Sequence, residues 1–202
     1  MVDMEVTKEA IVNEFYAIKD LITENVTLTR ESAPAGCVCL WRFDVNAPTH
    51  YLESPTDTVP KETNGISFWV KVKEGFPSVK PEVYYNVNKH LASVNAFRNG
   101  AQCIDDWIYD PSHAGNNSTL VKTVEKTIKD IIHDPSVSRF DSMANSDVMD
   151  WQKNNIRNHR FPTVPLSHVF RLDNGRGRAE VVPNLPQKAV VAINTPPALP
   201  TR

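Results

Sequence analysis

The chain has 202 residues, of which 41% are hydrophobic and 23% are charged, and its net charge is −2. These values are typical of one globular domain with an appendage, and they argue against a protein that binds nucleic acid through its overall charge. Three cysteines are too few for a disulfide scaffold and favour a reducing compartment. The N-terminus is acidic where a signal peptide would be basic, and no stretch approaches the ~20 apolar residues of a membrane span. We therefore expect a cytoplasmic protein that binds neither nucleic acid nor membranes.

Apolar residues at helical spacing predict a first helix over residues 7–25, with Thr7 as its N-cap. Four short segments rich in β-branched and aromatic residues predict strands, separated by turn formers. These strands are expected at residues 26–29, 37–45, 66–72 and 81–87. Within the loop between the second and third of them, an edge strand is expected around Tyr51.

Residues 86–114 form a long segment without periodicity, and loops of this length are usually functional or disordered. We expect it to be ordered, because Phe97, Trp107 and Tyr109 can anchor it to a core. A second helix is predicted over 119–133, with Ser118 or Thr119 as N-cap and Pro135 at its end, and a third over 146–157.

The composition becomes proline-rich and basic after residue 160. This divides the chain into a domain at 1–160 and a C-terminal extension at 161–202. Residues 168–172 and 178–182 flank turn formers and are a candidate hairpin within the extension. The extension is expected to pack partly on the domain or on a partner, and to end in a proline-rich tail.

Cys103 is the strongest candidate for a functional side chain. It lies in a polar, glycine-containing loop ahead of a helix, where a thiolate could act as a nucleophile. The alternative is a small buried residue, because free cysteine is among the most buried residue types. Cys37 and Cys39 alternate on a strand without partners at zinc spacing, which favours core packing. His90 and His113 flank the loop and are either bases for an incoming amine or solvated loop residues.

The order of motifs around Cys103 resembles the ubiquitin-conjugating enzyme family over roughly residues 7–155. The segment Asn99-Gly100-Ala101-Gln102-Cys103 matches the Asn-Gly-x-x-Cys of that family, and Ile104-Asp105 stands where the family has Leu-Asp. Upstream, Phe76-Pro77 and Pro81-Glu82-Val83 fill the places of its Tyr-Pro turn, second proline and strand. Downstream, residues 120–136 look like its helix and Asp-Pro-Asn turn.

Two departures stand out. Asn95 falls on the asparagine of the family's His-Pro-Asn signature, but Ser93 and Val94 replace the histidine and proline. Arg139 falls where many members have an acidic gate residue, with Asp141 two positions later. The departures suggest a divergent branch, of the kind found in bacterial ubiquitin-like conjugation operons, some of which are linked to antiphage defence.

The resemblance implies an α+β domain, with a four-stranded antiparallel meander sheet packed against helices. It implies that Cys103 accepts a ubiquitin-like modifier as a thioester from an activating enzyme and transfers it to an amine on a protein substrate. Asn95 would steady the oxyanion or hold the loop, with an ordinary turn former as the alternative reading. No cofactor is expected, because the activating enzyme would spend the ATP.

Four further residues are candidates for receiving or orienting the acceptor, with helix caps and surface charge as the alternative reading: His113, Asp105, Asp110 and Asp141. Two other functions stay open. A non-catalytic module of the same fold would bind a modifier or scaffold a complex. An unrelated thiol hydrolase would need a base within hydrogen-bond reach of Cys103.

Overall fold

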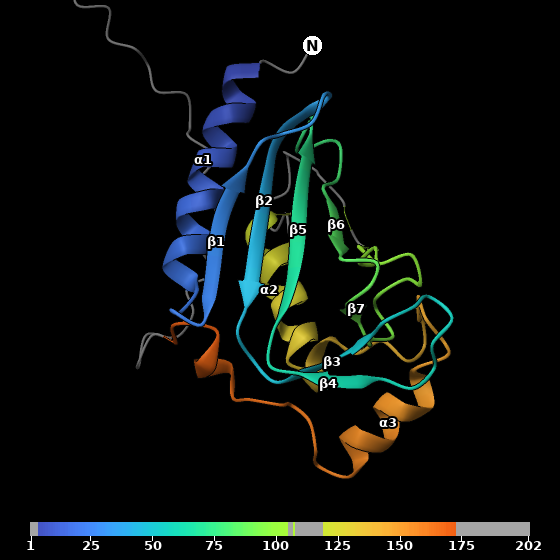
Figure 1. The fold of residues 1–202 in the computed structure, drawn as a ribbon. Coiled ribbons are helices and arrows are strands. Elements are labelled where there is room, and N and C mark those ends of the chain that lie inside the picture. The colour runs from blue at the N-terminus through green and yellow to red at the C-terminus, as the bar shows by residue number, and fades with distance from the viewer. Residues whose placement is uncertain (1–3, 105–106, 108–118, 173–202) are drawn as a thin grey trace, which may run out of the picture.

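The computed structural model describes residues 4–104, 107 and 119–172, which fold into an α+β domain (Figure 1). Its helices are α1 (Met4–Leu21), α2 (Leu120–Ile131) and α3 (Met149–Arg157), with short 3-10 helices η1 (Pro135–Val137) and η2 (Leu166–His168). Its strands are β1 (Val26–Glu31), β2 (Cys37–Val45), β3 (Thr49–Leu52), β4 (Lys61–Thr63), β5 (Ile66–Lys73), β6 (Glu82–Tyr85) and β7 (His90–Leu91).

The four predicted strands form one antiparallel sheet in the order β1-β2-β5-β6. They follow one another in the chain, apart from an excursion between β2 and β5 that contributes to a second sheet in the order β4-β3-β7. The edge strand expected around Tyr51 is β3. The rest of this small sheet was not predicted, because β4 and β7 have only three and two residues and show no alternation.

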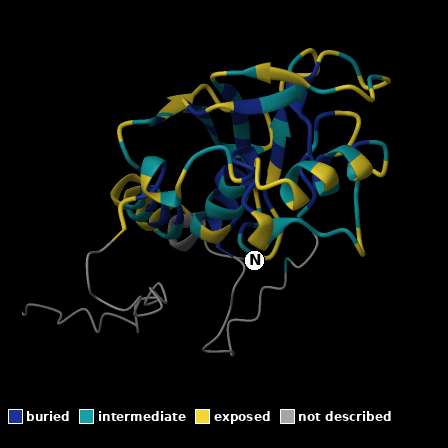
Figure 2. Cartoon of the chain, turned by 90° about the horizontal axis from the view of Figure 1, so that it is seen from below, coloured by how far each residue is buried: buried dark blue, intermediate teal, exposed yellow. Residues whose placement is uncertain are grey.

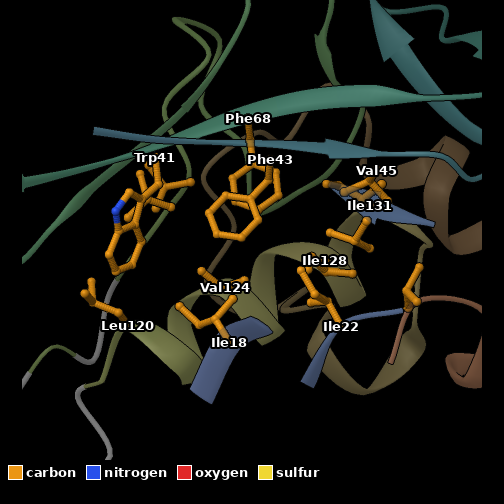
Figure 3. Packing of buried hydrophobic residues seen from close by; sticks show 14 of the residues in the cluster. Ile18, Ile22, Trp41, Phe43, Val45, Phe68, Leu120, Val124, Ile128 and Ile131 are labelled. Atoms are coloured by element: carbon orange, nitrogen blue, oxygen red, sulfur yellow. The ribbon is translucent and has the colours of Figure 1, made fainter. Parts of the chain in front are cut away.

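The core lies between one face of the four-stranded sheet and the helices α1 and α2. Strict alternation along β2 and β5 buries Trp41, Phe43 and Phe68 on that face, and Phe43 and Phe68 stack with ring centroids 4.7 Å apart. Figure 3 shows these rings facing Val124 and Ile128 of α2 and Ile18 of α1. Burying such side chains is the main driving force for folding. Seen from below, the buried residues follow the strands and the inner side of the helices (Figure 2).

Both ends of α1 differ from the expected ones, whereas α2 has the expected N-cap but ends at Ile131 rather than at His133. The prediction that Thr7 caps the first helix is wrong, because α1 begins at Met4 and runs through it, and the helix ends at Leu21 rather than at Asn25. Thr119 caps α2 as predicted, with its hydroxyl accepting a hydrogen bond from Lys122 N at 3.1 Å.

Residues 161–172 pack against the domain. Val169 and Phe170 are buried in the main core, and Phe170 forms a bridge with Ile22. Arg171 N donates to Leu21 O at 2.8 Å, which closes the end of α1. The second half of the candidate hairpin lies outside the described residues. No helix in the described part of the chain is both long and apolar enough to cross a membrane.

Candidate functional site

Cys103 lies at the end of a segment that runs beside the edge strand β6. Gln102 N donates to Val83 O at 2.8 Å, and Ala101 forms an antiparallel bridge with Tyr84. Cys103 N in turn donates to Asn95 O at 2.8 Å. The thiol is not in a disulfide, and the residue is 8% exposed. The backbone around Cys103 is therefore held on two sides.

The Asn99-Gly100 pair has a structural task in this segment. Gly100 has a φ of 84°, and a Cβ at this position would lie 3.1 Å from Tyr85 O. Asn99 Oδ1 accepts a hydrogen bond from Ala101 N at 3.0 Å, which supports the turn. The turn brings the chain back beside β6, with Tyr85 N donating to Gly100 O at 2.7 Å. The dipeptide thus places Cys103 next to the sheet edge.

Of the three expected anchors, one is confirmed. Trp107 lies 5.9 Å from the ring of Phe76 between centroids and donates its indole N–H to Pro77 O at 2.9 Å. Phe97 is 41% exposed, so the prediction that it anchors the loop is wrong. It sits on the tight turn that ends at Gly100, where Gly100 N donates to Phe97 O, and its side chain is left partly exposed. Tyr109 lies outside the described residues.

Asn95 is buried, and both hydrogens of its side-chain amide are in use. Its Nδ2 donates to Asp130 Oδ1 at 3.1 Å and to Val137 O at 2.9 Å. Donation to an oxyanion would require breaking one of these bonds. Of the two roles expected for Asn95, the geometry therefore favours holding the loop.

Sequence reasoning missed the carboxylate on which this loop is anchored. Asp130 of α2 is fully buried and accepts hydrogen bonds from Ser93, Asn95 and Gln102. Burial raises the pKa of Asp130 above its usual value, and these hydrogen bonds and the charge of Lys126 oppose the rise. The sequence gives little sign of this role, because an acidic residue within a helix is usually a surface charge. Asp130 is nevertheless among the buried residues of α2.

The other predicted site residues are not brought together by the described structure. Asp141 is exposed between η1 and α3. His113, Asp105 and Asp110 lie outside the described residues. His90 is buried, with Nδ1 3.4 Å from Val87 O and with Nε2 lacking a hydrogen-bond partner in the described part of the chain. His90 is therefore not a solvated loop residue. Burial lowers the pKa of its ring, which favours the neutral form.

The remaining cysteines belong to the sheet. Cys39 is buried in the core, and burial raises the pKa of its thiol to about 11, which makes it a poor nucleophile at neutral pH. Cys37 is half-buried beside an irregularity in the pairing of β2 with β5. Within the described ranges, no group of three or more His, Cys, Asp or Glu side chains could hold a metal ion.

No model of a known protein family matches the chain, and no curated protein matches it.

Proposed function

We propose that the protein is a ubiquitin-like protein conjugating enzyme whose nucleophile is Cys103. The observation that carries the proposal is the setting of this thiol. It follows the Asn99-Gly100 turn, lies beside the edge strand of a four-stranded antiparallel sheet, and precedes the amphipathic helix α2. This order of elements and motifs is the one expected from the resemblance described above.

The chemistry needs little from the protein beyond presentation of the thiol. The Cys103 thiolate attacks the thioester carbonyl that joins the modifier to the activating enzyme, and the bond to the activating enzyme's sulfur breaks. An amine of the substrate then attacks the new thioester, loses a proton, and releases Cys103 as thiolate. Transfer from thioester to amide is downhill. Asn95 fixes the loop that carries Cys103, through hydrogen bonds to Asp130 and to Val137 O.

On the same resemblance, we place the activity in a bacterial ubiquitin-like conjugation system of the kind linked to antiphage defence. The partners would be a modifier with a C-terminal glycine, an activating enzyme and a protein substrate. Helix α1 would contribute to the surface that meets the activating enzyme, through residues such as Lys8 and Lys19. The second candidate is a non-catalytic module of the same fold that binds a modifier, and it is favoured by the low exposure of Cys103.

A charging assay tests the proposal. The protein is mixed with candidate activating enzymes, modifiers and ATP, and the products are separated on a non-reducing gel. We expect a band of protein plus modifier that thiol removes, that Cys103→Ala abolishes, and that Cys37→Ala leaves intact. Cys103→Lys should trap an amide-linked product that resists thiol. If the cognate partners give no band while the parent and Cys103→Ala both bind the modifier, the enzyme is excluded and the binding module remains.

A thiol hydrolase is separated from both candidates by a partner-free test. Rapid inactivation by a thiol-reactive peptide aldehyde, with the label on Cys103, would favour the hydrolase. We expect slow labelling, because His90 is buried and burial lowers the pKa of its ring, which makes it a weak base for the thiol proton.

A further inference from the structure

One buried carboxylate collects side-chain donors from both arms of the turn that leads to Cys103. Ser93 Oγ donates to Asp130 Oδ1 at 2.6 Å, and Asn95 Nδ2 donates to the same oxygen at 3.1 Å. Gln102 Nε2 donates to Asp130 Oδ2 at 3.1 Å. Asp130 is 0% exposed and belongs to α2. Three bonds thus tie the segment to one helix.

The pattern of donors matches an ionised carboxylate. Gln102 must present its N–H to Asp130, because Gln102 Oε1 accepts a hydrogen bond from the Tyr85 hydroxyl at 3.0 Å. Asn95 also acts as a donor there, since its Nδ2 donates to Val137 O as well. An ionised carboxylate only accepts hydrogen bonds, and the three side chains that contact Asp130 can all donate to it. The charge on Asp130 and the geometry of the segment therefore support each other.

The link from Asp130 to the thiol is short. Gln102 is the residue before Cys103, and Asn95 O accepts the hydrogen bond from Cys103 N at 2.8 Å. Ala96 and Gln102 form an antiparallel bridge that joins the two arms. Any shift of Asn95 or Gln102 is thus passed directly to the backbone that carries the thiol.

We infer that Asp130 is a positioning residue for Cys103, whose carboxylate fixes the backbone from which the thiol is presented. The effect of Asp130 on thioester exchange rests on the proposed function. Its effect on the geometry of the segment before Cys103 does not. Asp130 does not take part in bond making. It acts through Asn95 and Gln102.

An exchange of amide and acid tests this role. In Asp130→Asn, the new amide nitrogen faces Gln102 Nε2, and a flip of Gln102 leaves the Tyr85 hydroxyl proton without an acceptor. Adding Gln102→Glu restores every partner. The carboxylate introduced on the loop accepts from the Tyr85 hydroxyl and from the amide introduced on α2, and the oxygen of that amide accepts from Ser93 and Asn95. The double variant keeps one negative charge in the network but moves it from position 130 to position 102.

The matched control is Glu14→Gln. Glu14 of α1 is also a buried carboxylate attached to α2, since its Oε2 accepts a hydrogen bond from Val121 N at 2.9 Å. Burial raises the pKa of Glu14 in the same direction as that of Asp130. However, Glu14 contacts the N-terminal end of α2, away from Asp130 in the last turn of the helix. It reports what the loss of a buried charge on this helix does by itself.

The first readout is hydrogen exchange of the Cys103 amide, which needs no partner protein. Leaving one buried donor unsatisfied should speed this exchange at least about tenfold in Asp130→Asn, with the amides of α1 unchanged. The double variant should return to within about threefold of the parent, and Glu14→Gln should not change the rate at Cys103.

The second readout is the charging assay. We expect kcat for thioester formation to fall at least about tenfold in Asp130→Asn with KM for the activating enzyme nearly unchanged, and to recover in the double variant. The positioning role is overturned if Asp130→Asn changes neither readout, or if the double variant exchanges as fast as the single one. If the parent forms no thioester, the proposed function fails, and the exchange measurement still decides the role of Asp130.

Discussion

Acidification from pH 7.5 to 5.5 is expected to destabilise the protein through His133, which follows α2. The ring of His133 stacks on Phe161 with centroids 4.2 Å apart, and its Nε2 lies 3.2 Å from His50 Nδ1. Its Nδ1 is buried and has no hydrogen-bond partner in the described part of the chain. Burial, together with the neighbouring His50, lowers the pKa of His133 from 6.5 to about 3.

The sign of the effect follows from proton uptake by the unfolded chain. The folded protein keeps His133 neutral, whereas the unfolded chain binds a proton near pH 6.5, so the stability contribution is complete above pH 6.5 and is lost as the pH falls toward 3. For these two pKa values the loss is about 1 kcal/mol between pH 7.5 and 5.5, and about 3 kcal/mol by pH 4.5. Burial lowers the pKa of His50 as well, which acts in the same direction.

Urea unfolding at pH 7.5 and 5.5 measures this loss in the parent and in His133→Asn. Asparagine suits the position because His133 has a φ of 56°, a left-handed conformation that asparagine tolerates. Each protein is compared with itself, so the loss of stacking on Phe161 cancels. The parent should lose about 1 kcal/mol more than the variant, with equal m-values. Equal losses in the two proteins would refute the reasoning.

Three further changes test the turn, the cap and the core by thermal or urea unfolding. Gly100→Ala should cost roughly 1–3 kcal/mol, because a Cβ at a φ of 84° would press on Tyr85 O, and a neutral effect would contradict the turn geometry. Thr119→Ala should cost about 1 kcal/mol and Thr119→Ser far less, because either hydroxyl accepts from Lys122 N; similar losses would exclude the cap. Ile128→Ala should cost about 2–5 kcal/mol and Ile128→Val about 0.5–1.5 kcal/mol, and a smaller loss for alanine would place Ile128 outside the core.

Local patterns in the sequence were enough to predict the main sheet and α2. The alternation of residue types along β2 and β5 predicts which of their side chains are buried. Thr119 and the apolar stripe that follows it predict where α2 begins. The start of α1 was misjudged because Thr7 is a good cap residue by type, while the turn before it is helical as well.

The parts that sequence reasoning missed depend on partners far apart in the chain. From the sequence, Asp130 has the character of a surface charge on a helix. Its donors Ser93 and Gln102 lie 37 and 28 residues earlier in the chain, so no local pattern reveals them. His50 and His133 are separated by 83 residues, so no local pattern predicts their contact. Phe97 was misplaced for a local reason, because it begins the tight turn in which Gly100 N donates to Phe97 O, and apolarity alone does not reveal that its side chain stays partly exposed there.

The attachment of residues 161–172 to α1 has a consequence for how the chain folds during synthesis. The Thr23 hydroxyl donates to His168 O at 2.6 Å across 145 residues, and Arg171 N closes the end of α1. Helix α1 is thus synthesised before its last partners, which come from nearly the last residues of the described domain. At a synthesis rate of roughly 5–20 residues per second, the 145 residues between these partners take roughly 7–30 s, during which the C-terminal carbonyls of α1 are open to solvent. Contacts of such long sequence separation also slow folding in free solution. Until residues 168–171 are synthesised, the C-terminal end of α1 therefore lacks the partners that hold it in the folded domain.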